Sequence, residues 1–200
     1  MDKYGTGQDP YTYPDSSILR NKLNISNENE LNFAESQLVT LALQDIDFQP
    51  PPYNFSYLCT LHFQLFGDVY DWAGQPRTIA ISKQDTRFCQ PEFIVREANK
   101  LFAQLEQENY LIELSFDAFC LKMAEFYIEL NMIHPFREGN GRGQRLLFEH
   151  LAIFCGYNLS FKNITKEQWV QANILGCLKC DYSEMKDIMA KSLTAIKDLL

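Results

Sequence analysis

The sequence lacks any apolar stretch of the roughly 18 residues that a membrane-spanning helix needs. Its first residues, MDKYGTGQDPYTYP, do not have the basic and then apolar order of a signal peptide, so we expect a cytoplasmic protein. Basic residues are scarce as well, since 18 Lys and Arg stand against 26 Asp and Glu and give a net charge of −8. This balance argues against general binding to nucleic-acid phosphates, so any phosphate must be held by a local site.

Histidines and cysteines, which commonly hold metal ions such as zinc, are few and scattered. The chain has three histidines and six cysteines, and Cys177 and Cys180 form its only C-x-x-C pair, without a second pair or a nearby histidine. We interpret the cysteines as reduced thiols that are buried or incidental. In contrast, 46% hydrophobic and 14% aromatic residues over 200 positions suit one globular domain with a sizeable core.

Helical spacing of apolar residues dominates the chain. It predicts helices over about 28–45, 55–66, 91–108, 115–133 and 145–155, one after the capping box of Thr165 and Gln168, and a last one over 182–199. Alternating residues over 77–82 predict a strand, and residues 87–89 its partner. The sequence therefore predicts a mainly α-helical single domain, residues 1–200, with one small β-hairpin at about 77–90.

The stretch HPFREGNGRGQR, residues 134–145, combines features of a phosphate-binding loop. Pro135 pushes His134 out of helical geometry, so the preceding helix should end near Ile133. A Gly-Asn-Gly loop follows, and a second helix should begin at about Gly141. Because the start of a helix offers unpaired N–H groups and the positive end of its dipole, this loop predicts a cradle for an anion.

The charged side chains of this stretch suit a polyphosphate. Arg142 and Arg145 lie three residues apart on one helix face, and guanidinium groups fit phosphate oxygens. Glu138 is the only carboxylate in the loop and predicts a Mg²⁺ ion that bridges it to phosphate. The side chain of Asn140 can donate to a phosphate oxygen. His134 can accept a proton at cellular pH, as a general base does.

Simpler explanations exist for each feature taken alone, because a histidine can merely end a helix, glycines can form a turn and arginines a solvated face. Their combination within twelve residues favours a reaction site. The order of a P-loop is missing, and no strand precedes the loop as in a dinucleotide-binding fold. We expect Phe136 to anchor the loop inward, and partly buried structural roles for His62 and His150. Arg137 could face a target or only solvent.

The same stretch resembles the signature of the Fic family, H-P-F-x-[DE]-G-N-G-R-x-x-R, and matches it at every specified position. The segment LFGDVYDWAGQPRTIAISKQDTRFCQPEFI, residues 65–94, resembles the family's path through its flap hairpin. FEHLAIFCGYNLSF, ITKEQWVQAN and the start YGTGQDPYTYP are also similar to the family. The resemblance covers nearly the whole chain and implies the Fic fold, with a core over about 55–175.

The resemblance implies transfer of AMP from Mg-ATP to a hydroxyl, for which we expect a tyrosine, of a target protein. His134 would be the base and Glu138 the Mg²⁺ ligand. The residues implied to bind the nucleotide are Gly139, Asn140, Gly141, Arg142 and Arg145. The flap would align a target segment by strand pairing, and adenine would lie near the flap and residues 169–173. The implied docking residues are Ile81, Ser82, Lys83 and Phe88.

Family members often carry an inhibitory helix with the motif [ST]-x-x-x-E-[GN], which this sequence matches only in part. The partial matches are Asn24 before Glu28-Asn29, Gln104 before Glu108-Asn109, and Ser26 before Glu30-Leu31. The resemblance therefore implies a toxin that a separate antitoxin inhibits through Arg145. The expected targets are the ATPase subunits of the type II topoisomerases, DNA gyrase and topoisomerase IV. Two alternatives remain: a Fic enzyme with another phosphate-containing donor, and a non-catalytic nucleotide-binding module.

Overall fold

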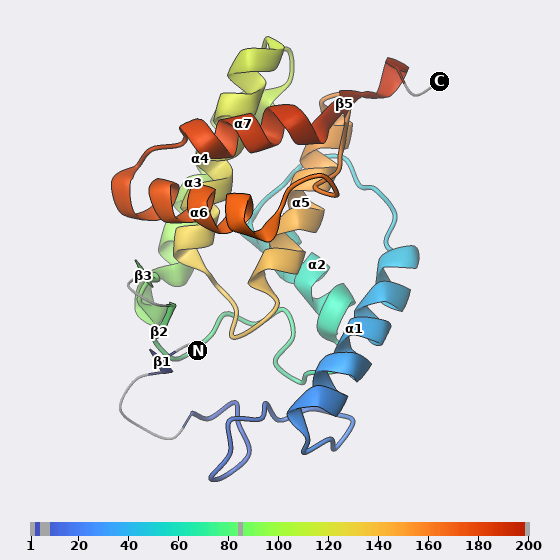
Figure 1. Ribbon diagram of the computed structural model, residues 1–200, viewed down its shortest axis with the longest axis vertical. Coiled ribbons are helices and arrows are strands. Elements are labelled where there is room, and N and C mark those ends of the chain that lie inside the picture. Colours follow the sequence, from blue (N-terminus) through green and yellow to red (C-terminus); the bar gives the residue numbers. More distant parts are fainter. Residues whose placement is uncertain (1–2, 5–8, 84–85, 199–200) are drawn as a thin grey trace.

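The computed structural model describes residues 3–4, 9–83 and 86–198, and helices dominate this part of the chain (Figure 1). The α-helices are α1 (Glu28–Gln44), α2 (Phe55–Phe66), α3 (Ile94–Gln107), α4 (Phe116–Ile133), α5 (Asn140–Phe154), α6 (Lys166–Lys179) and α7 (Ser183–Ser192). Short 3-10 helices span Pro91–Phe93, Asn109–Leu111 and Ile196–Asp198. The prediction of a mainly α-helical fold is confirmed. None of the described helices combines the length and the apolar character of a membrane span.

Side-chain caps set several helix starts. The oxygens of Asn27 and Asn54 accept the N–H groups three residues ahead, at the starts of α1 and α2. Ser115 caps α4 in the same way, and Thr165 forms the predicted capping box with Gln168 at the start of α6. Each cap satisfies an N–H group that the first helical turn leaves unpaired, which fixes where the helix begins.

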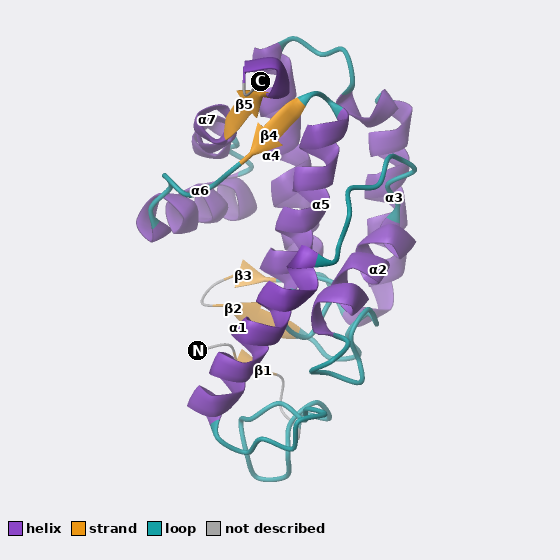
Figure 2. Ribbon diagram, turned by 90° about the vertical axis from the view of Figure 1, so that its right-hand side faces the viewer, coloured by secondary structure: helices purple, strands orange, loops and turns teal. Residues whose placement is uncertain are grey.

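The helices α4 and α5 form the centre of the bundle (Figure 2). The pair α6 and α7 packs on one side of them, α2 and α3 lie on the other, and α1 packs along α2. Because it has neighbours on several sides, α4 is buried around most of its surface. Its buried residues are Phe119, Cys120, Met123, Ala124, Phe126, Tyr127, Ile128, Leu130 and Ile133. The motif loop joins the end of α4 to the start of α5 at one end of these two central helices (Figure 1).

The predicted hairpin is present but shorter than expected, with strands β2 (Ile81–Lys83) and β3 (Thr86–Arg87). The prediction that the first strand begins at residue 77 was wrong, because the Arg77 side chain turns into the protein and bonds main-chain carbonyls. An unpredicted strand, β1 (Lys3–Tyr4), pairs antiparallel with β2, and the sheet has the order β1-β2-β3.

The chain also contains a second small sheet, which the sequence pattern did not indicate. Strand β4 (Tyr157–Leu159) pairs antiparallel with β5 (Leu193–Ala195). The prediction of a helix over 182–199 was therefore wrong beyond Ser192, and residue 199 lies outside the described residues. The buried Leu193 faces Leu159 in the register, so a contact between distant segments overrides the helical spacing.

Candidate active site

His134 lies directly after α4, at the end that Pro135 terminates as predicted. Its backbone is left-handed, with φ 47° and ψ 62°, and its N–H still bonds the carbonyl of Leu130. The imidazole Nδ1 lies 3.2 Å from the carbonyl oxygen of Asn131. A carbonyl can only accept a hydrogen bond, so Nδ1 carries the proton. The lone pair of His134 is therefore on Nε2, the atom that can accept a proton from a substrate.

The flap covers the His134 ring. Phe88 stacks on it with ring centroids 3.9 Å apart and planes 14° from parallel. Burial lowers the pKa of His134 to about 3, and the nearby cations Arg77 and Lys83 also lower it, against the opposite effect of the Asn131 carbonyl. Burial and positive neighbours lower this pKa because both disfavour the charged imidazolium. His134 is thus neutral at cellular pH.

Arg77 holds the flap against the end of α4, although the sequence analysis did not single it out. The residue is only 2% exposed. Its guanidinium donates to the carbonyls of His134 at 2.8 Å, Ile79 at 2.6 Å and Cys89 at 2.5 Å. Its main-chain N–H bonds the carbonyl of Pro135 at 2.8 Å. An arginine before a strand resembles a solvated residue in sequence, so only the fold reveals this role.

Gly139 makes the turn that starts α5. Its φ is +78°, and an added Cβ would lie 2.5 Å from the Phe66 ring, so both conformation and space require glycine. At the start of α5, the main-chain N–H of Arg142 bonds the Gly139 carbonyl. The N–H groups of Asn140 and Gly141 precede it and have no acceptor within the helix. This is the geometry of an anion-binding helix start.

Asn140 closes the loop on itself. Its side-chain oxygen accepts from the N–H of Phe136 at 2.8 Å, and its side-chain nitrogen donates to the Phe136 carbonyl at 2.7 Å. The side-chain oxygen and one of the two N–H groups of the amide are thus engaged within the loop, and the expectation that this side chain donates to a phosphate stays a prediction. Phe136 itself is buried, as predicted.

His62 supports the loop from α2 and is fully buried. Its Nδ1 accepts from the N–H of Gly74 at 2.9 Å, so its Nε2 carries the proton and donates to the Glu138 carbonyl at 2.9 Å. Burial lowers its pKa to about 4, and the ring stacks on Phe136 at 3.8 Å. His62 thus has the predicted structural role, in which it supports the motif loop. His150 is also buried and contacts the hydroxyl of Tyr57 at 2.6 Å.

Glu138 presents a carboxylate at the start of α5, with 44% of its side chain exposed. One oxygen accepts from the Gly139 N–H at 2.9 Å and lies 3.9 Å from the Arg142 guanidinium. Within the described ranges, no group of three or more His, Cys, Asp or Glu residues could hold a metal ion. A lone, accessible carboxylate still fits Mg²⁺, because this ion commonly takes one or two carboxylates and fills its shell with phosphate and water.

The two motif arginines have different surroundings. Arg145 is exposed, and its guanidinium lies over the Trp169 ring at 5.4 Å and interacts with the Tyr127 side chain. Arg142 lies over Phe66 and forms a 2.6 Å ion pair with Glu35 of α1. The contact with Glu35 was not predicted, since no local pattern connects α1 with the motif.

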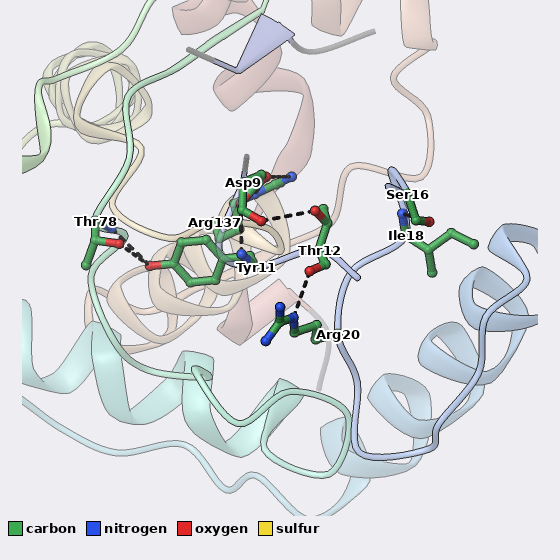
Figure 3. A network of polar contacts seen from close by, with 8 residues as sticks. All are labelled: Asp9, Tyr11, Thr12, Ser16, Ile18, Arg20, Thr78 and Arg137. Atoms are coloured by element: carbon green, nitrogen blue, oxygen red, sulfur yellow. Dashed lines mark hydrogen bonds and ion pairs between the residues drawn. The ribbon is translucent and has the colours of Figure 1, made fainter. Parts of the chain in front are cut away.

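Arg137 faces neither a target nor solvent, so both alternatives considered for it were wrong. Its side chain is 3% exposed and donates to one oxygen of Asp9 from Nε at 3.0 Å and Nη2 at 2.8 Å (Figure 3). The other carboxylate oxygen of Asp9 accepts from the Tyr11 N–H, and its carbonyl accepts from the Thr12 hydroxyl. The ion pair therefore joins the N-terminal segment to the motif loop.

The predicted docking residues of the flap differ in their exposure to solvent. Ile81 and Phe88 are buried, while Lys83 is exposed. Ile81 and Ser82 pair with Tyr4 and Lys3 of β1, so the chain's own strand lies at this edge of β2. Cys177 is a partly buried free thiol and Cys180 an exposed one.

A helical bundle with a neutral histidine next to an anion-binding helix start is compatible with phosphate chemistry, and comparison with known proteins identifies its family. Residues 52–152 match the model of the Fic/DOC family. The chain is 40% identical over 197 residues, 98% of each chain, to the "Probable protein adenylyltransferase Fic" of Salmonella typhimurium. The protein belongs to the Fic/DOC family.

Solved structures share the same fold. The N-terminal Fic domain of a VirB-translocated effector protein from Bartonella quintana, with bound ADP, is 32% identical with a TM-score of 0.85, over 94% of this chain and 96% of that one. The effector BepC from Bartonella tribocorum, with bound AMPPNP, is 29% identical with a TM-score of 0.83, over 92% of this chain and 96% of that one. Both relatives hold an adenine nucleotide.

Proposed function

We propose that this protein is a protein adenylyltransferase that moves AMP from Mg-ATP to a hydroxyl, that of a tyrosine, on a target protein. The observation that carries the proposal is the neutral His134, whose Nε2 lone pair is available next to the start of α5. The relatives' adenine nucleotides and the relative named as a probable adenylyltransferase support the same reaction.

In the proposed reaction, His134 Nε2 accepts the proton of the target hydroxyl while its oxygen attacks the α-phosphorus of ATP. The new oxygen–phosphorus bond forms as the bond to the β-phosphate bridging oxygen breaks, and pyrophosphate leaves. The N–H groups of Asn140 and Gly141 stabilise the charge that develops on the phosphate. Arg142 and Arg145 bind the β- and γ-phosphates. Glu138 would hold the Mg²⁺ ion, which offsets phosphate charge when bound.

The target would dock by adding a strand to the flap. Main-chain pairing of this kind needs an open edge, and β1 now pairs with Ile81 and Ser82 of β2. A target strand would take the place of β1, with the flap residues Lys83 and Phe88 beside it. We further propose a cytoplasmic toxin that modifies the ATPase subunits of DNA gyrase or topoisomerase IV. A separate antitoxin would inhibit it by inserting a glutamate against Arg145, which is exposed.

Labelling identifies the acceptor. The purified protein is incubated with Mg²⁺ and α-labelled ATP, together with the gyrase and topoisomerase IV subunits or with a bacterial lysate, and the labelled band is analysed by mass spectrometry. We expect AMP on a tyrosine of an ATPase subunit. Label only on another protein would reject the topoisomerase targets but retain adenylyl transfer. A panel of other labelled nucleotides tests a different donor, and ATP binding without label on any protein would favour the non-catalytic module.

A further inference from the structure

Glu35 brings a buried carboxylate from α1 to the motif helix. The residue is 7% exposed and lies outside residues 52–152, the segment that the family model matches. One of its oxygens accepts a hydrogen bond from the hydroxyl of Tyr70. The other lies 2.6 Å from Nη1 of Arg142. A buried carboxylate with both oxygens engaged has little freedom to move, so it is a fixed support for the arginine.

The Arg142 guanidinium is restrained by more than this ion pair. Its central carbon lies 4.6 Å from the centroid of the Phe66 ring, so one face of the guanidinium packs on an aromatic surface. Its Nη1 is bound to Glu35, and its Nη2 points toward Glu138, 3.9 Å away. The side chain is still 35% exposed. Arg142 is thus accessible yet oriented, with Nη2 on the side of the proposed Mg²⁺ ligand.

We propose that Glu35 is a positioning residue that orients Arg142 toward the β- and γ-phosphates of the bound nucleotide. This inference rests on the proposed function, because it assigns a purpose to the same phosphate site. An arginine side chain held before the ligand arrives loses less conformational freedom on binding, which raises affinity. Glu35 therefore strengthens the binding of nucleotides that carry a β-phosphate and has no effect on those that lack one.

The opposite role for Glu35 would be competition, in which its carboxylate occupies the position of a phosphate on Arg142. The geometry argues against it. Glu35 is buried and bonded to Tyr70 behind it, and it engages only Nη1 of the guanidinium. A phosphate beside Glu138 would meet Nη2 instead, so the carboxylate and the phosphate occupy different edges of the same group. The two roles predict opposite changes in affinity when the charge of Glu35 is removed.

The test measures the affinities of ATP, ADP and AMP for the full chain by displacement of a fluorescent ATP analogue. Glu35→Gln keeps the shape and an acceptor for Tyr70 but removes the charge. We expect ATP and ADP to bind about tenfold more weakly, a change typical of losing one charge-assisted contact, while AMP binding stays unchanged. Glu30→Gln, an exposed carboxylate on the same helix, is the matched control and should change nothing.

Two further variants separate orientation from folding. Tyr70→Phe should weaken ATP and ADP binding in the same direction but less than Glu35→Gln does. Adding Glu35→Gln to Arg142→Ala should cause no further loss, because Glu35 acts through Arg142. Equal or tighter ATP binding by Glu35→Gln would overturn the inference, and so would an equal loss for AMP. If the wild-type protein bound none of the nucleotides, the proposed function itself would be rejected.

Discussion

The twelve-residue motif has an inner half and an outer half. In the inner half, Phe136, Arg137 and Asn140 are buried, and their polar groups bond within the loop or, for Arg137, to Asp9. In the outer half, Glu138 and Arg145 present charges that solvent can reach. A continuous signature thus combines residues that build the loop with residues that are available to a ligand. The two kinds of residue should fail in different ways when they are changed.

His134 is the proposed general base, so its replacement should have the largest effect on the rate of AMP transfer. We expect His134→Ala to lower the rate of label transfer by about 10²–10⁴, the usual contribution of a positioned general base. ATP affinity should stay within about twofold, since no phosphate contact is removed. Transfer rates and nucleotide binding are measured on the same preparations. Transfer that survives the substitution would reject His134 as the base.

A change in the inner half should cost stability. Asp9→Ala removes the carboxylate that pairs with the buried Arg137 guanidinium, and we expect the free energy of unfolding to fall by about 3 kcal/mol. Urea denaturation measures the effect, with the exposed Asp47→Ala as control, for which we expect a change within about 0.5 kcal/mol. Similar midpoints for the two variants would show that the ion pair does not hold the loop.

Acid should also destabilise the protein around the motif loop. Burial holds the pKa of His62 at about 4 and that of His134 at about 3, below the value of roughly 6.5 for an unfolded chain. Below pH 6.5 the unfolded state therefore binds more protons, so stability present at neutral pH is lost as the pH falls. We expect a loss of about 2 kcal/mol for each of the two imidazoles, about 4 kcal/mol together, between pH 7 and 5.

Urea midpoints at pH 7, 6 and 5 measure this dependence. His62→Gln should make it less steep, because a buried imidazole with a lowered pKa is then missing. An unchanged midpoint across this range in the wild-type protein would contradict the environment described for both histidines.

A change in the outer half should affect ligand binding and leave stability intact. Arg145→Ala removes an exposed guanidinium, and we expect ATP to bind about tenfold more weakly with an unfolding midpoint close to that of the wild type. AMP should be bound as before, because the proposed contact is with the γ- or β-phosphate. Unchanged ATP affinity would count against a phosphate role for Arg145.

The sequence predicted the elements whose signals are local. The apolar spacing of α2, the Ser115 cap of α4 and the stop at Pro135 all depend on neighbouring residues, and the structure has these boundaries. The second sheet was missed, because Leu193 is extended through a contact with a segment more than 30 residues away.

The same limit applies to the site. The motif itself placed His134, Glu138 and the arginines together, since they are close in sequence. Asp9 and Glu35 were not found, because the ion pairs with Arg137 and Arg142 join distant segments. Arg77 was not identified because its buried partners are main-chain carbonyls, which leave no trace in the residue types.

The reaction proposed for this site is transfer of the α-phosphoryl group of ATP with its adenosine. The most direct measurement compares ATP labelled at the α-phosphate with ATP labelled at the γ-phosphate, each incubated with the wild-type protein, Mg²⁺ and bacterial lysate. We expect a labelled protein band with α-labelled ATP only, together with released pyrophosphate. A band with γ-labelled ATP, or label in neither case despite nucleotide binding, would contradict it.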